Sequence, residues 1–158
     1  MVKLWQKHRY AESRLPDCPL ELKLQLIFYL QIDSCMFYND LAVYQGFGGV
    51  VLAKEEGRNI ADSLGPSHRN VILRNHGILT AGGTIAEAAA FFIALERCCQ
   101  TQLLVEAAIA NGNMSKTFVG KEEAAYTKKC TGSPECMYMQ FLPEYRLILK
   151  ETNGEFLK

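Results

Sequence analysis

The sequence lacks the charge imbalance that marks many proteins that bind nucleic acids or membranes. It holds 17 basic and 17 acidic residues, so its formal net charge is zero, and its isoelectric point is near 6.8. No overall field therefore attracts polyanions or an anionic bilayer. We expect no nucleic-acid partner.

Paired-cysteine motifs are also missing. None of the six cysteines belongs to a CxxC pair, and Cys98 and Cys99 are adjacent. Such spacing is typical neither of a disulfide framework nor of a zinc ribbon. The sequence therefore predicts reduced thiols and a cytoplasmic protein.

Long apolar runs are absent as well. The run Leu24 to Leu30 is short and contains Gln25, while Glu96 and Arg97 interrupt the longest helical pattern. These features predict neither a signal peptide nor a membrane span. A length of 158 residues is usual for one domain with a single core.

Two short runs rich in apolar and β-branched residues lie near the middle of the chain. Val71 to Leu73 and Ile78 to Thr80 have the length of buried strands, and Asn75-His76-Gly77 between them has turn or bulge residues. Gly82-Gly83 ends the second run. The pattern predicts two strands joined by a tight connection that carries His76.

A long helix is predicted directly after these strands. Thr84 to Glu87 fits a capping box, in which the Thr84 hydroxyl accepts from the Glu87 amide and the Glu87 carboxylate accepts from the Thr84 amide. Apolar residues then recur at helical spacing as far as Ala110, and Asn111-Gly112-Asn113 supplies a stop. Such a helix would be about 39 Å long.

The segment from Arg74 to Gly77, the Gly82-Gly83 pair and the Thr84 to Glu87 helix start together resemble the class II aldolase and adducin head domain family. The resemblance covers residues 33–158, and residues 1–32 are an unmatched N-terminal arm. It implies an α/β domain with αβα layers around a central mixed or largely antiparallel sheet, incomplete on its N-terminal side.

The same resemblance assigns a metal role to His76. In the enzymes of the family this histidine is one of three that bind a divalent metal, usually Zn²⁺, and the other two come from an upstream His-x-His. The remaining histidines, His8 and His68, do not form such a pair, and Tyr10 stands where the second ring after His8 is required. The resemblance therefore implies a degenerate zinc site with His76 as its one recognisable ligand.

The residues by themselves leave two roles open for His76, which can stabilise a turn or ligate a metal. His68 follows Pro66-Ser67 and is typical of a surface turn. Glu87 and Glu96 are the candidate substitute acids, but the capping box explains the first and an exposed helix face explains the second. We therefore predict no catalytic residue.

The flanking segments have weaker patterns. Gly46 to Gly49 lacks both GxGxxG spacing and a following Lys-Ser/Thr pair, so a plain turn is favoured over a phosphate loop. Glu21 to Ile32 fits a short helix or a strand equally well. The remaining predictions are an extended or frayed arm over 1–19, a loop leading into a strand over 33–44, a strand over 50–52, helices over 54–64 and 121–129, and one or two helices over 135–142 and 144–150.

Two functions follow from the resemblance. The first is a truncated relative of metal-dependent aldolases that act on small hydroxy-carbonyl or sugar-phosphate substrates, catalytically impaired because the His-x-His is absent. The second is a non-catalytic adducin-like module associated with actin filaments and the cytoskeleton. The family also implies a homo-oligomer. Residues 1–32 are expected to be either a genuine alternative start or an artefact of gene prediction.

Overall fold

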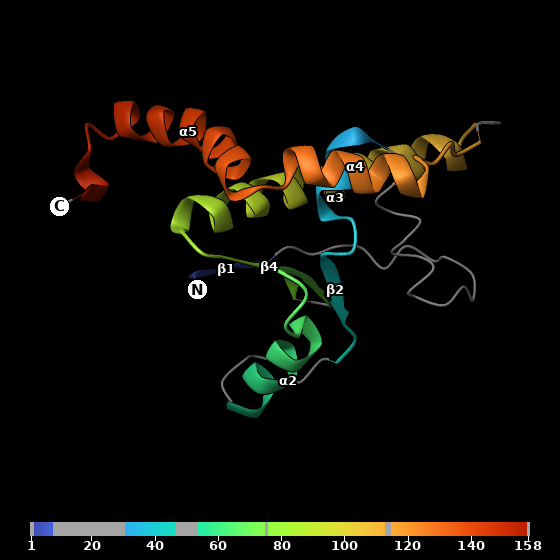
Figure 1. Ribbon diagram of the computed structural model, residues 1–158, viewed down its shortest axis with the longest axis horizontal. Helices are drawn as coiled ribbons and strands as arrows, with labels where there is room; N and C mark the ends of the chain where they lie inside the picture. Colours follow the sequence, from blue (N-terminus) through green and yellow to red (C-terminus); the bar gives the residue numbers. More distant parts are fainter. Residues whose placement is uncertain (1, 8–30, 47–53, 75, 113–114, 158) are drawn as a thin grey trace.

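The computed structural model describes residues 2–7, 31–46, 54–74, 76–112 and 115–157. Within them the chain forms four strands, four α-helices and two short 3₁₀-helices (Figure 1). In chain order these are β1 (Val2–Lys7), η1 (Ile32–Phe37), β2 (Leu41–Tyr44), α2 (Lys54–Leu64), β3 (Asn70–Leu73), β4 (Gly77–Gly82), α3 (Ile85–Ala110), α4 (Lys121–Thr131), α5 (Pro134–Glu151) and η2 (Glu155–Leu157).

The four strands form one mixed sheet in the order β1-β4-β3-β2. Strands β3 and β4 pair antiparallel, with Asn70 opposite Thr80 and Leu73 opposite Gly77. Strand β2 pairs parallel with β3, and α2 forms the crossover between them. The predicted strand pair around His76 is thus the centre of the sheet.

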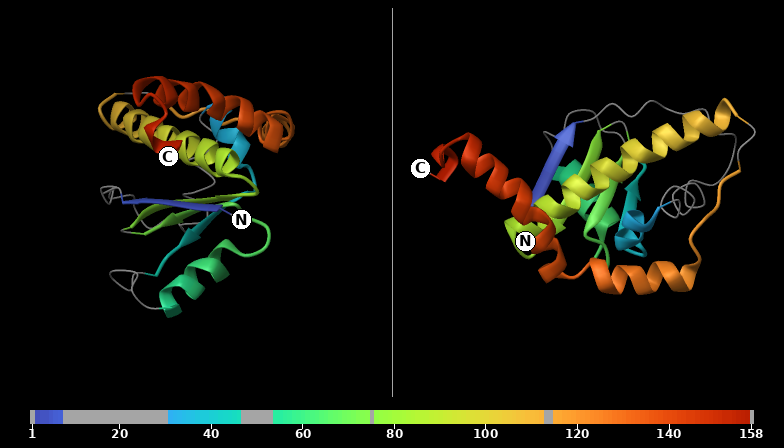
Figure 2. Two further views of the ribbon diagram at one scale, coloured as in Figure 1. Left: turned by 90° about the vertical axis from the view of Figure 1, so that its left-hand side faces the viewer. Right: turned by 90° about the horizontal axis from the view of Figure 1, so that it is seen from above.

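Helices cover both faces of this sheet, as Figure 2 shows in its edge-on view, with α3, α4 and α5 on one side and α2 on the other. On the α2 side, Ile60 and Leu64 pack against Val71 and Leu73. The Tyr44 hydroxyl also donates to Glu56 Oε2 at 2.9 Å, which ties β2 to α2. The predicted α/β layered αβα architecture with a mixed sheet is confirmed.

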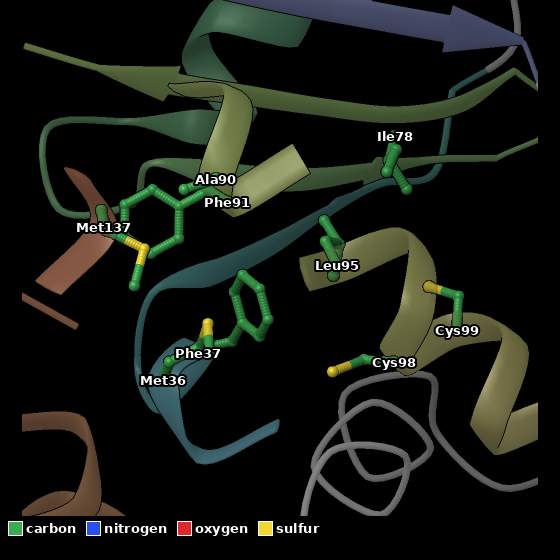
Figure 3. Packing of buried hydrophobic residues seen from close by; sticks show 9 residues of the cluster. All are labelled: Met36, Phe37, Ile78, Ala90, Phe91, Leu95, Cys98, Cys99 and Met137. Carbon is green, nitrogen blue, oxygen red and sulfur yellow. The ribbon is translucent and has the colours of Figure 1, made fainter. Parts of the chain in front are cut away.

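The larger core lies between the sheet and α3. Phe91 and Leu95 of α3 are fully buried beside Ile78 of β4, and Phe37 of η1 and Met137 of α5 close the cluster (Figure 3). The Phe37 and Phe91 rings lie 5.9 Å apart between centroids in a tilted arrangement. This cluster joins η1, β4, α3 and α5 into one apolar unit.

The N-terminal arm contributes a strand to the sheet. Val2–Lys7 pairs antiparallel with β4 in a register that places Val2 opposite Gly82 and Lys7 opposite Gly77. The first residues are therefore extended, as expected, but they form an edge strand of the domain and are not a separate arm. Residues 8–30, which include His8 and the ambiguous segment from Glu21, lie outside the described residues, and the division at residue 33 stays a prediction.

Most helix predictions are confirmed, with two differences in detail. The predicted loop before β2 contains the 3₁₀-helix η1. The segments before and after Pro143, which the sequence leaves as one or two helices, form the single helix α5. Helix α2 ends as predicted, with Gly65 at a φ of +60°, a left-handed conformation that glycine adopts without strain. The predicted turn and strand over 47–52 lie outside the described residues.

Helix α3 is long and apolar enough, by length and composition alone, to cross a membrane. Its first half instead packs on β4, where Ala88, Phe91 and Leu95 are fully buried. A core helix passes the same test of length and hydropathy, so the apolar character of this half follows from its place in the domain.

Candidate functional site

His76 lies in the connection between the two central strands. Its amide donates to the Leu73 carbonyl at 3.0 Å, and Gly77 follows at a φ of +135°, a conformation that L side chains rarely adopt. The residue is 6% exposed, so the tight turn places the imidazole inside the domain. The His76 amide thus takes part in the turn between β3 and β4, which is one of the two roles that the sequence leaves open.

His68 lies at the other end of β3 from His76. Its Nδ1 is 3.1 Å from the Leu64 carbonyl oxygen, at the end of α2, and the side chain is partly buried. Four strand residues separate the two histidines, and each adds about 3.3 Å along the strand. His68 thus contacts the end of α2 and does not join His76.

A catalytic zinc site needs about three protein ligands within roughly 2.0–2.3 Å of the metal. In the residues that the structure describes, no group of three or more histidine, cysteine, aspartate or glutamate side chains is placed to hold a metal ion. The described donors around His76 therefore do not fit the zinc site that the resemblance implies.

Glu87, one of the candidate acids, takes part in two contacts at the start of α3. The Thr84 hydroxyl accepts from the Glu87 amide at 3.1 Å, as predicted. Glu87 Oε2, however, accepts from the Gly83 amide at 2.6 Å, so the predicted bond to the Thr84 amide is wrong by one residue. Gly82 lies directly behind this turn, where a Cβ atom would be 2.7 Å from the Ala88 amide nitrogen.

The other carboxylate oxygen of Glu87 binds Arg69. Arg69 Nη1 donates to Glu87 Oε1 at 2.9 Å, while Arg69 Nε and Nη2 donate to Asp40 Oδ2 at 2.8 and 2.5 Å. The Arg69 amide also donates to Asp40 Oδ1 at 2.6 Å. The carboxylates of Asp40 and Glu87 are almost fully buried, and Arg69 forms an ion pair with each.

Two further contacts extend this group, which we call the Arg69 network (Asp40, Arg69, Glu87 and Lys128). The Arg69 guanidinium lies 4.5 Å from the centroid of the Phe91 ring, a cation–π contact. Lys128 Nζ lies 3.6 Å from Asp40 Oδ2 and donates to the Tyr38 carbonyl at 2.6 Å. The network joins the starts of β2, β3 and α3 to α4. Its two carboxylates therefore connect elements of the fold.

Sequence reasoning assigned Glu87 only to a cap and did not consider Asp40 or Arg69. The two residues are separated by 29 positions and belong to no motif, so no local pattern indicates their pairing. Glu96, the other candidate acid, is partly buried in the middle of α3.

Comparison with known proteins places this geometry in a family. Residues 20–103 match the sequence profile described as "Class II Aldolase and Adducin N-terminal domain", which is more than half of the chain. The chain belongs to this family. The family match begins at residue 20, which is earlier than the start at residue 33 expected from the motifs. It includes both His68 and His76.

Two similar solved structures support the same fold. L-fuculose 1-phosphate aldolase from Glaciozyma antarctica PI12 is 33% identical and has a TM-score of 0.68, over 81% of this chain and 46% of that one. An aldolase II superfamily protein from Pseudomonas syringae is 25% identical, with a TM-score of 0.64 over 79% of this chain and 49% of that one.

The curated relatives have diverse names. Decarboxylase NovR from Streptomyces niveus is 46% identical over 76 residues, which are 48% of this chain and 28% of that protein. The meiotically up-regulated gene 14 protein of Schizosaccharomyces pombe is 33% identical over 126 residues, 80% of this chain and 48% of that protein. Beta-adducin of Rattus norvegicus is 25% identical over 124 residues, 78% of this chain and 17% of that protein. The chain thus spans about half of these relatives or less.

Proposed function

We propose that this chain is a class II aldolase and adducin-type domain that does not catalyse an aldol reaction by itself. The observation that carries the proposal is the donor set around His76. The full sequence has three histidines, and none forms a His-x-His. In the described part of the chain, no group of three or more histidine, cysteine, aspartate or glutamate side chains could hold a metal ion. The proposed relation to aldolases of small hydroxy-carbonyl or sugar-phosphate substrates is therefore one of descent and fold.

The Arg69 network supports the same proposal. Metal-assisted aldol chemistry needs a group that moves a proton, and a carboxylate serves when it is placed beside the substrate. Glu87 instead accepts from the Gly83 amide and from Arg69 at 2.6 and 2.9 Å. A carboxylate held by two donors in a structural network is poorly available for proton transfer.

Elemental analysis of the purified chain tests the proposal, with His76→Ala and His68→Ala as matched variants. We expect zinc well below one atom per chain in all three proteins, and no cleavage of hydroxy-carbonyl or sugar-phosphate substrates. About one zinc per chain that is lost in His76→Ala and retained in His68→Ala would overturn the proposal. Such a result would mean that other donors complete a site with His76.

An adducin-like role in binding actin filaments is the second candidate function. It is favoured by the match to beta-adducin, which extends over 124 residues of this chain, whereas the match to decarboxylase NovR covers 76. Co-sedimentation with filamentous actin tests this role. A chain that stays in the supernatant at all actin concentrations would exclude it and leave the non-catalytic domain without an actin partner.

We also propose that the chain is a cytoplasmic homo-oligomer. The support for self-association is the set of large apolar side chains that α3, α4 and α5 leave exposed, together with the typically oligomeric state of class II aldolases. The support for the compartment is the absence of a disulfide among the described cysteines. Sedimentation velocity tests the first point, and a single monomeric species at high concentration would contradict it.

A further inference from the structure

Two cysteines lie on either side of the turn between α4 and α5, and the thiol of one contacts the backbone of the other. Cys130 lies exposed in the last turn of α4, and Cys136 lies partly buried in the first turn of α5. The Cys136 Sγ donates to the Cys130 carbonyl oxygen at 3.1 Å. This side-chain to backbone contact places the Cys136 thiol next to the backbone of Cys130.

Bond lengths limit how far apart the two residues can be. A residue's Cα lies about 2.4 Å from its own carbonyl oxygen and about 2.8 Å from its Sγ, so the two Cα atoms are at most about 8 Å apart. Disulfides join Cα atoms that are roughly 4.4–6.8 Å apart. This upper limit overlaps the range that disulfides span. Rotation of the side chains is enough if the Cα atoms lie within that range, and a shift of the turn by about 1–2 Å is needed if they lie at the limit.

Backbone contacts hold the turn in this shape. The Gly132 amide donates to the Lys128 carbonyl at 2.8 Å and closes α4. The Ser133 hydroxyl accepts from the Cys136 amide at 3.2 Å and caps α5. Both cysteines thus lie in capped helix ends, and the contact between the Cys136 Sγ and the Cys130 carbonyl does not depend on a loose loop.

The other described cysteines are buried. Cys35, Cys98 and Cys99 are between 0% and 8% exposed, inside the core beneath α3. Burial raises the pKa of the Cys98 thiol to about 11, which disfavours the reactive thiolate. Cys130 and Cys136 therefore differ from the buried cysteines in being more exposed to solvent and in lying close together in the α4–α5 turn.

We propose that Cys130 and Cys136 are a reversible redox pair that forms an intramolecular disulfide across the α4–α5 turn. The oxidant is a low-molecular-weight disulfide of the glutathione class. The Cys130 thiolate attacks one sulfur of this disulfide, which forms a mixed disulfide and releases one thiol. The Cys136 thiolate then attacks the Cys130 sulfur, which closes the protein disulfide and releases the second thiol.

In this exchange the two protein thiols lose two electrons and two protons, and one disulfide is reduced to two thiols. The second step is intramolecular, so the local concentration of Cys136 at the mixed disulfide exceeds that of any thiol in solution. The bond would fix α4, which Lys128 anchors to the Tyr38 carbonyl, against α5, which the buried Met137 anchors to the core. The proposal holds whether or not the chain binds zinc.

Peptide mapping of the full chain tests the proposal. The reduced protein is incubated with oxidised glutathione, alkylated without reduction and digested by a protease that cleaves after glutamate. Cleavage after Glu123, Glu135 and Glu144 places Cys130 and Cys136 on separate peptides. We expect the two peptides to be recovered linked, about 2 Da lighter than their sum, and to separate after reduction.

Single variants supply the controls. Cys136→Ser is expected to accumulate glutathione on Cys130, because the closing thiol is absent, and Cys130→Ser is expected to react more slowly because Cys136 is partly buried. The proposal is overturned if the wild-type peptides carry only alkyl groups or only glutathione. It is equally overturned if either cysteine is found linked to Cys35, Cys98 or Cys99.

Discussion

The two halves of α3 differ in what they contact, although one continuous helix contains both. In the first half, from Ile85 to Cys99, the side chains that face β4, η1 and α5 are buried. In the second half, from Gln100 to Ala110, only Gln102 is buried, and Leu103 and Leu104 are 42% and 66% exposed. Figure 2 shows this end of α3 extending past the sheet in the view from above.

The difference teaches that apolar composition and stability are separate properties of a helix. Both halves carry apolar residues at helical spacing, but only the first half removes them from water within this chain. Burial contributes about 25 cal/mol per Å² of apolar surface, so the first half carries most of the stabilisation that α3 provides. The second half leaves its leucines in contact with water and contributes less.

Phe91→Ala is predicted to have the largest effect, because it tests the buried half directly. The ring is fully buried, packs on Phe37 and lies under the Arg69 guanidinium. Its removal leaves a cavity and should lower the free energy of unfolding by about 3–5 kcal/mol. Urea unfolding followed by circular dichroism measures the loss.

Leu104→Ala is the matched variant in the exposed half. We expect a change of less than about 0.5 kcal/mol, because the side chain is already in contact with water. A loss above about 2 kcal/mol at Leu104 in the isolated chain would contradict the comparison. It would mean that the second half of α3 is covered in solution.

Asp40→Asn is expected to have the next largest effect. The substitution keeps the shape of the side chain but removes the charge that pairs with Arg69 within the Arg69 network. Arg69 keeps Glu87 as a counter-charge, but it loses charge-assisted hydrogen bonds to Asp40, and Lys128 loses a carboxylate partner. We therefore expect a cost of about 1.5–3 kcal/mol. Urea unfolding at neutral pH measures the decrease.

The matched ion pair lies on the surface between α3 and α5. Arg97 Nη2 is 2.6 Å from Glu144 Oε1, and both side chains are exposed by a third or more. Exposed pairs contribute under about 1 kcal/mol, so Glu144→Gln should change stability little. If Asp40→Asn were no more costly than Glu144→Gln, the structural role assigned to the Arg69 network would be wrong.

Local patterns were sufficient to predict the elements near His76. Two short apolar runs, a glycine pair and a capping threonine each determine structure within a few residues, and β3, β4 and the start of α3 follow them. The Arg69 network was not predictable, because Asp40 and Arg69 meet only when β2 and β3 align. The sheet role of Val2–Lys7 was missed for the same reason, since its partner β4 lies about seventy residues away.

Single residues of the candidate site could be predicted from the sequence, but the contacts between them could not. The sequence identified His76 and the missing His-x-His, and the structure added that Glu87 is held by Arg69. Periodicity also could not separate the two halves of α3, because a pattern of apolar residues shows a face but not what covers it. The prediction was thus limited for two reasons. Contacts between residues far apart in the chain leave no local pattern, and a pattern of apolar residues does not show how much of a helix face is buried.

Cys98, at the end of the buried half of α3, predicts a pH dependence. Burial raises its pKa from 9.0 to about 11, with smaller contributions from Asp33 and Cys35, and outweighs the lowering by the Gln31 hydrogen bond. Above pH 9 the unfolded thiol ionises while the folded thiol does not, so the stability present below pH 9 is lost as pH rises toward 11. The loss at pH 10 is about 1.4 kcal/mol.

The measurement is the difference between two unfolding profiles recorded from pH 8 to pH 10.5. Other groups also titrate in this range, so the Cys98 contribution is the part of the decline that disappears in Cys98→Ala. Leu104→Ala, which retains the thiol, should follow the wild-type profile. Parallel declines in wild type and Cys98→Ala would show that the thiol is not shielded from water at the end of the buried half.

The caps of α3 provide the smallest and most selective test of the comparison. Thr84 accepts from the Glu87 amide at the start of the buried half, and Asn111 donates to the Ala107 carbonyl at the end of the exposed half. Thr84→Ala should cost about 1 kcal/mol, and Thr84→Ser should restore most of it. Asn111→Ala should cost less than about 0.5 kcal/mol, because unwinding the last turn there exposes little buried surface. Equal losses at the two caps would mean that the halves fold with equal cooperativity, and the exposed half would then be as firmly held as the buried one.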